Sequence, residues 1–84
     1  MTLTNEIIRY SVDTLTAEVV ERYAINNDIK LTDALKLFMK TKTFDLLCDS
    51  ESFLFLESVE YVYDMLEAEK EDDMERWLEV WYGS

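Results

Sequence analysis

The chain has 84 residues, 49% of them apolar, and a net charge of −11, which suits one folded domain over residues 1–84 and excludes two. It has no histidine and one cysteine, Cys48. This composition excludes an internal disulfide, a Cys-rich zinc site and any nucleophile activated by histidine. We therefore expect a protein that is not an enzyme and that holds no cofactor or metal.

Two further exclusions concern location. The longest run of large apolar residues, 53–56, falls far short of the roughly 20 residues of a membrane span. Residues 1–4 have neither the basic region nor the apolar run of a secretion signal. We expect the protein to be cytoplasmic.

The negative charge is concentrated in the second half of the chain. Residues 49–84 contain twelve acidic residues against Lys70 and Arg76, whereas residues 1–48 contain seven acidic and six basic residues. A surface of this kind repels nucleic-acid phosphates and anionic membranes. The expected partner is another protein, with a basic surface, rather than a nucleic acid or a membrane.

Apolar residues recur at helical spacing in the first part of the chain. The repeat consists of Ile8, Val12, Leu15, Val19 and Tyr23. It predicts a helix over residues 5–25, either continuous or broken at Asp13–Thr14, where side chains compete for backbone hydrogen bonds. Residues 26–28 favour a turn.

Two shorter helices are predicted next. Thr32 is a suitable N-cap for the first of them, and Leu31 can fold back over its start. Its expected inner face consists of Leu35, Phe38 and Met39. A separate basic ridge consists of Lys36, Lys40 and Lys42. Thr43 is the expected cap of a short third helix, and residues 49–52 read as a loop.

The remaining segment combines strand and helix signals. Its aromatic content favours an extended stretch at residues 53–57, followed by an N-cap at Ser58 and a helix to about Glu71. Asp72 and Glu75 have the spacing of a capping box, so residues 59–82 form either one helix or two. The sequence predicts an all-α bundle of three to five helices with a short extended segment near residues 53–57.

An apolar stripe at the carboxy terminus is the first candidate binding surface. It consists of Met74, Trp77, Leu78 and Trp81. These spacings place all four residues on one side of a helix, and tryptophan is over-represented in protein interfaces. The stripe either packs back on the bundle or contacts a partner. We expect a homodimer that uses this stripe at least in part.

An acidic flank on the preceding helix is the second candidate. It consists of Glu57, Glu60, Asp64, Glu67 and Glu71. Such residues form a solvated face, a surface for a basic protein, or a mimic of nucleic-acid phosphates. Because they lie along one helix flank beside an aromatic stripe, rather than over a long exposed face, they favour protein recognition.

The stretches 41–47 (TKTFDLL), 55–58 (FLES) and 60–66 (EYVYDML) resemble a group of small, acidic, helical bacterial proteins without an assigned activity. Some groups of this kind are encoded beside toxin-like genes. The resemblance implies an antitoxin-like or immunity-like role, and it assigns no site residue. We predict a non-catalytic protein-interaction module that neutralises or regulates a basic partner. The alternative is an acidic nucleic-acid mimic that blocks a DNA-binding protein.

Overall fold

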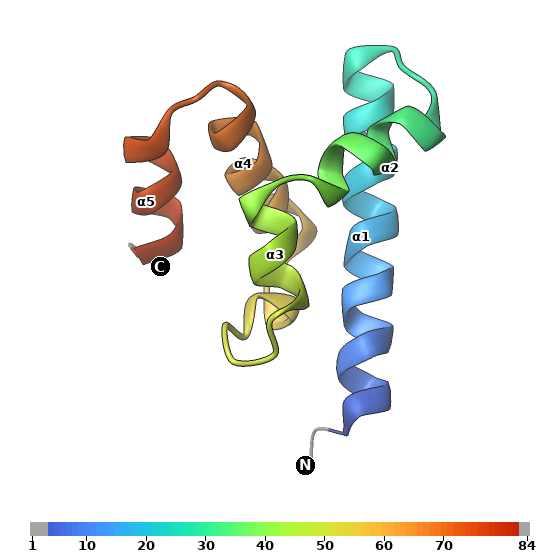
Figure 1. Cartoon of the computed structure of the whole chain (residues 1–84), viewed down its shortest axis with the longest axis vertical. Helices are drawn as coiled ribbons and strands as arrows, with labels where there is room; N and C mark the ends of the chain where they lie inside the picture. Colours follow the sequence, from blue (N-terminus) through green and yellow to red (C-terminus); the bar gives the residue numbers. More distant parts are fainter. Residues whose placement is uncertain (1–3, 83–84) are drawn as a thin grey trace.

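The predicted all-α bundle is confirmed by a computed structural model, which describes residues 4–82 (Figure 1). Part of the segment considered for a secretion signal, residues 1–3, lies outside this range. The described helices are α1 (Asn5–Asn27), α2 (Leu31–Met39), α3 (Lys42–Cys48), the 3-10 turn η1 (Leu54–Leu56), α4 (Val59–Lys70) and α5 (Met74–Tyr82).

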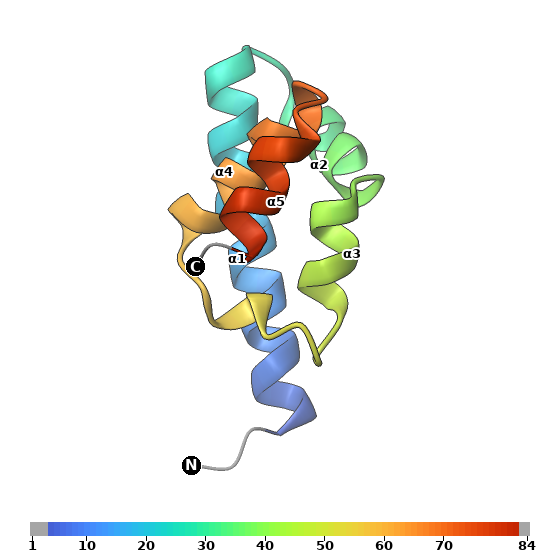
Figure 2. The same ribbon diagram turned by 90° about the vertical axis from the view of Figure 1, so that its left-hand side faces the viewer.

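Helix α4 lies at the centre of the bundle. It contacts α1, α3 and α5, and Figures 1 and 2 show it between α1 and α5. Its buried face consists of Val62, Tyr63, Met65, Leu66 and Ala68. Because these residues recur at helical spacing, the acidic residues between them are directed outward.

Helix α1 is continuous through Asp13 and Thr14, as the first of the two alternatives predicted. Thr4 caps its start by accepting a hydrogen bond from the Ile7 backbone N–H at 3.2 Å. Asp28 ends it in a left-handed conformation with φ of 52°. Packing of the buried Leu15 and Val19 on the core outweighs the weak local preference of two residues for a break.

The predicted caps of α2 and α3 are wrong. Helix α2 begins at Leu31 after Lys30, which makes no side-chain cap, so Thr32 lies inside the first turn. Helix α3 is capped by Thr41, whose Oγ1 accepts from the Phe44 N–H at 3.1 Å. Thr43 is buried inside α3 because its hydroxyl takes part in a long-range contact described below. The predicted cap at Ser58 is confirmed.

The predicted extended segment at residues 53–57 is also wrong. Phe53 has a left-handed conformation with φ of 59°, and the turn η1 follows it. A single extended segment would leave its backbone N–H and C=O groups without partners in the bundle. The turn satisfies two of these N–H groups and two of these C=O groups locally, through Leu56 N–H to Phe53 O at 3.1 Å and Glu57 N–H to Leu54 O at 3.0 Å.

Residues 59–82 form two helices rather than one. The chain reverses at Asp72, which has a left-handed conformation with φ of 57°. Asp73 then caps α5, since its carboxylate accepts from the Arg76 N–H at 3.0 Å. The predicted cap at Asp72 is therefore wrong by one residue, because Asp72 makes the turn that its neighbour then caps.

A carboxylate on α4 connects the three carboxy-terminal helices. Glu69 accepts from the backbone N–H groups of Lys42 at 2.7 Å and Thr43 at 2.9 Å, and from the Thr43 hydroxyl at 2.9 Å. The Thr43 oxygen in turn accepts from Trp77 Nε1 at 3.1 Å. Helix N-termini leave such N–H groups without intrahelical partners and favour a negative charge. Glu69 therefore stabilises the start of α3, and Trp77 covers the contact from α5.

Glu69→Gln tests this contact. Glutamine keeps the shape but replaces one accepting oxygen with a donor, which leaves a backbone N–H of α3 without a partner. We expect the free energy of unfolding to fall by about 1–3 kcal/mol, measured by urea denaturation followed by circular dichroism. The matched control is Glu67→Gln on the exposed side of α4, with an expected change within about 0.5 kcal/mol. Equal effects of the two variants would contradict the role of Glu69.

Trp77→Ala tests the packing of α5. The Trp77 side chain is 8% exposed, and its removal opens a cavity in the core. We expect a loss of about 3–5 kcal/mol in the free energy of unfolding. Leu78→Ala, at a residue that is 44% exposed, should cost less than about 1 kcal/mol. A Trp77→Ala protein as stable as the Leu78→Ala control would contradict internal packing.

Candidate functional site

Most of the carboxy-terminal apolar stripe packs against the bundle. Trp77 belongs to the core, and Met74 and Trp81 are half-buried against it. The Tyr61 hydroxyl donates to the Val80 carbonyl oxygen at 2.6 Å and helps to hold the end of α5. Leu78 is the member of the stripe that the structure leaves exposed. Trp77 is therefore covered by the bundle itself.

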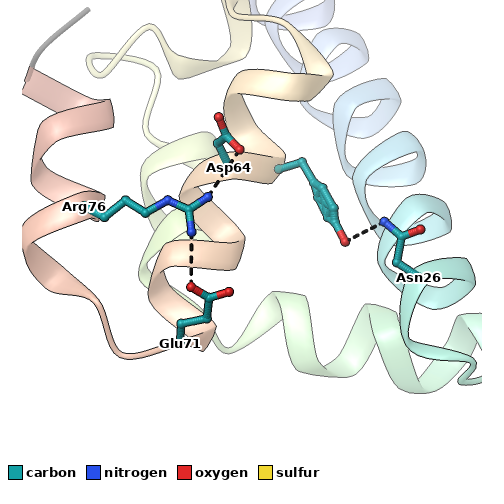
Figure 3. A network of polar contacts seen from close by, with 5 residues as sticks. Asn26, Asp64, Glu71 and Arg76 are labelled. Atoms are coloured by element: carbon teal, nitrogen blue, oxygen red, sulfur yellow. Dashed lines mark hydrogen bonds and ion pairs between the residues drawn. The ribbon is translucent and has the colours of Figure 1, made fainter.

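The acidic flank is exposed but partly paired within the chain. Arg76 of α5 lies between Asp64 of α4 and Glu71, the residue that follows α4, with N–O distances of 3.5 and 3.2 Å (Figure 3). Glu60 lies 3.7 Å from Arg22 of α1. The other two members, Glu57 and Glu67, have no ion pair within residues 4–82. The five carboxylates therefore do not form one free acidic site, and Arg76, which the sequence analysis did not single out, joins α5 to α4.

Two of the three residues predicted for the inner face of α2, Leu35 and Met39, are exposed, as is Leu31 at the start of the helix. Leu31, Leu35 and Met39 are 57%, 38% and 52% exposed, whereas Ala34 and Phe38 are buried. The predicted inner face is thus correct only for Phe38. Six of the nine residues of α2 are apolar, which makes its apolar face wider than α1 and α3 can cover. That unusual width is the sequence signal for a free surface. Leu31, Leu35 and Met39 recur every four residues, and we call them the α2 stripe.

A groove adjoins the α2 stripe between α1 and α2. It has a volume of about 390 Å³ and is lined by Asp13, Thr16, Ala17, Val20, Glu21, Leu31, Thr32 and Leu35. Val20 is buried, and the two acidic residues are exposed. We call this hollow the α1–α2 groove. An apolar groove that continues into an exposed apolar stripe is typical of a surface that binds a protein segment.

A second groove, between α1 and α4, is more polar. Its volume is about 420 Å³, and its lining includes Glu18, Glu21 and Glu60 together with the basic Arg22. The Arg22–Glu60 ion pair lies within this set. Because its lining is largely charged, it suits water and ions better than an apolar side chain. The α1–α2 groove is the better candidate for apolar recognition.

Cys48, at the carboxy-terminal end of α3, is exposed and free. Partial burial of the thiol raises the pKa of Cys48, and the carboxylates of Asp45 and Asp13 raise it further. A raised pKa lowers the fraction of thiolate, which is the reactive form. The environment of Cys48 therefore opposes nucleophilic chemistry.

Two further observations apply to the described residues. Between residues 4 and 82, no group of three or more Cys, Asp and Glu side chains is placed to hold a metal ion. None of the helices α1 to α5, as described, combines the length and the apolar character needed to cross a membrane.

Comparisons with models of protein families, with curated proteins and with solved structures found no match to this chain. The resemblance expected from residues 41–66 therefore stays a prediction.

The reactivity of Cys48 is directly measurable. At pH 8 its raised pKa leaves less thiolate than an unperturbed cysteine has, so alkylation by iodoacetamide should be slower than for a short unstructured cysteine peptide. Asp13→Asn and Asp45→Asn together should increase the rate, because they remove two of the causes of the raised pKa. The pH dependence of the alkylation rate gives the pKa. A rate equal to that of the peptide would contradict the assignment.

Proposed function

We propose that this chain is a non-catalytic protein-interaction module that binds a partner protein through the α2 stripe and the α1–α2 groove. The observation that carries the proposal is the exposure of Leu31, Leu35 and Met39 beside an apolar groove. Burying a large apolar side chain is worth about 1.5–3 kcal/mol, so a domain this small gains substantially from covering three of them. A surface of this kind marks an interaction site in a small protein.

The charge supports a basic partner. Residues 49–84 carry twelve acidic residues against two basic ones, and the exposed Glu57 and Glu67 have no ion pair within the described chain. Long-range attraction would speed encounter with a basic surface, and apolar contacts at α2 would then hold the complex. Neutralisation of a basic toxin-like protein in the cytoplasm is the sharpest form of the proposal.

The nucleic-acid mimic is the weaker alternative. A mimic needs carboxylates that are free and spread along an exposed face, like phosphates on a duplex. Asp64, Glu71 and Glu60 instead lie beside arginines of the same chain, and Glu69 is bonded to the start of α3. These contacts reduce the free negative charge at the place where the mimic would require it.

A homodimer through the carboxy-terminal stripe would have little apolar surface to use, since Trp77 is buried. A dimer through the α2 stripe remains a competing outcome. The test below therefore distinguishes a second copy from a different protein.

Site-specific photocrosslinking tests the proposal. Benzoylphenylalanine is placed at Leu35 or Met39 in the full-length protein, which is expressed in the cells that produce it, and the adducts are identified by mass spectrometry. We expect both positions to give an adduct with the same protein. Binding of that protein, once purified, should weaken roughly tenfold or more with Leu31→Glu, because a charge replaces an apolar contact.

The matched control carries the photocrosslinker at Glu79, an exposed residue of α5. It should not form the adduct seen at Leu35 and Met39. The proposal would be overturned by the same adducts at all three positions, by adducts with nucleic acid only, or by crosslinks solely between two copies of the chain.

A further inference from the structure

We infer that the α1–α2 groove takes an amphipathic helix of the partner, with basic residues on the flank that faces α1. This inference rests on the proposed function and adds the chemistry of the bound segment. It is carried by the shape of the groove and by two acidic residues on one of its edges.

The shape of the groove favours a helix. Its walls are two helices, α1 and α2, which contact each other, and Val20 of α1 and Leu35 of α2 are among the residues that line it. A third helix placed in such a hollow completes a three-helix arrangement and packs its ridge of side chains into the groove. Residues of the α2 stripe are four positions apart, so a partner helix with apolar residues at three- and four-residue spacing matches it.

The acidic residues at one edge of the groove indicate which flank of the partner helix carries basic residues. Asp13, Ala17 and Glu21 are four residues apart on α1 and share one edge of the groove. At 1.5 Å per residue, the two carboxylate-bearing positions lie about 12 Å apart along the helix axis. Both are exposed, and neither has an ion pair within residues 4–82. Basic side chains about two turns apart on the partner helix would meet them.

The α2 side of the groove differs. Lys36 is exposed and lies on α2 opposite the buried Ala34 and Phe38, and Lys40 follows at the end of the helix. The α2 residues that line the groove, Leu31, Thr32 and Leu35, are uncharged, so lysines on this flank of a bound helix would meet no carboxylate of the groove lining. The bound segment is therefore basic on its α1 side and acidic or neutral on the other.

A second copy of this chain fits less well. Each copy carries a net charge of −11, and a symmetric contact through the groove would bring the acidic edges formed by Asp13 and Glu21 toward each other. Like charges brought together at an interface oppose association. The charge pattern thus favours a different protein.

A synthetic peptide is the probe. It has about 18 residues, enough for several helical turns, with leucines at three- and four-residue spacing and lysines on one flank. A second peptide has glutamate in place of each lysine. Binding to the full-length protein is measured by fluorescence anisotropy, and the contact surface is mapped from amide chemical shifts. We expect the lysine peptide to bind, with shifts confined to the surroundings of Ala17, Leu31 and Leu35, and the glutamate peptide to bind at least tenfold more weakly.

Two double variants distinguish binding in the groove from unspecific attraction of the basic peptide to the negative net charge of the protein. Asp13→Lys with Glu21→Lys reverses the edge of the groove, while Glu51→Lys with Glu79→Lys makes the same change in net charge at two exposed residues in the loop after α3 and on α5. We expect roughly a tenfold loss of affinity for the first and less than about a twofold change for the second. Circular dichroism verifies that both variants fold. Leu35→Glu provides an independent readout, with an expected loss of about tenfold or more.

Several outcomes would overturn the inference. Equal losses in the two double variants would mean attraction to net charge alone, and shifts on α4 or α5 would place the contact elsewhere. Equal affinity of the lysine and glutamate peptides would show that the bound helix does not need basic residues on the flank that faces α1. Dimerisation that Leu35→Glu abolishes would make a second copy the occupant. A partner captured from Leu35 and Met39, combined with no peptide binding, would leave the proposed function standing and refute only the helix.

Discussion

The contact between Glu69, Thr43 and Trp77 determines how the second half of the chain is assembled. Helix α3 has seven residues, too few for stability on its own in water. The Glu69 carboxylate accepts hydrogen bonds from the first N–H groups of α3. The Thr43 hydroxyl oxygen in turn accepts a hydrogen bond from the indole N–H of Trp77 in α5. Each helix thus provides a partner that another needs. The network lies where α3, α4 and α5 meet, and its polar groups are hydrogen-bonded to one another at the point where these helices pack together.

This assembly leaves α2 with little to cover it. Helix α4 is surrounded by α1, α3 and α5, whereas α2 contacts only α1 and α3 appreciably. Phe38 enters the core and packs edge-on against Phe44 at 5.3 Å, which fixes the orientation of α2. Leu31 and Leu35 line the α1–α2 groove, and Met39 stays exposed at the end of the helix. The exposed stripe is therefore a consequence of how the core is arranged, and it supplies the apolar part of the proposed binding surface.

Much of the fold could be predicted from the sequence, because the long repeats in α1 and α4 extend over several turns and dominate weaker local signals. Caps were harder, since neighbouring residues such as Thr41 and Thr43 are equivalent locally and a contact with Glu69 decides between them. The extended segment predicted at residues 53–57 is wrong for a similar reason, because a strand is stabilised by pairing with another strand and residues 4–82 contain none. The binding surface was hardest of all. Spacing places Trp77 and Leu35 on apolar faces, but only the packing of other helices decides that Trp77 is covered and Leu35 is not.

The distribution of contacts in this bundle also has a consequence for folding kinetics. Most packing joins helices that are neighbours in sequence, such as α1 with α2 and α4 with α5, and short-range contacts of this kind allow rapid folding. The Glu69 network is different, because it closes chain segments of 26 residues to Thr43 and 34 residues from Thr43 to Trp77. Closing such loops requires entropy to be lost before the contact forms. Helical hairpins should therefore form early, and the long-range contacts of α4 with α1 and α3 should complete the core later.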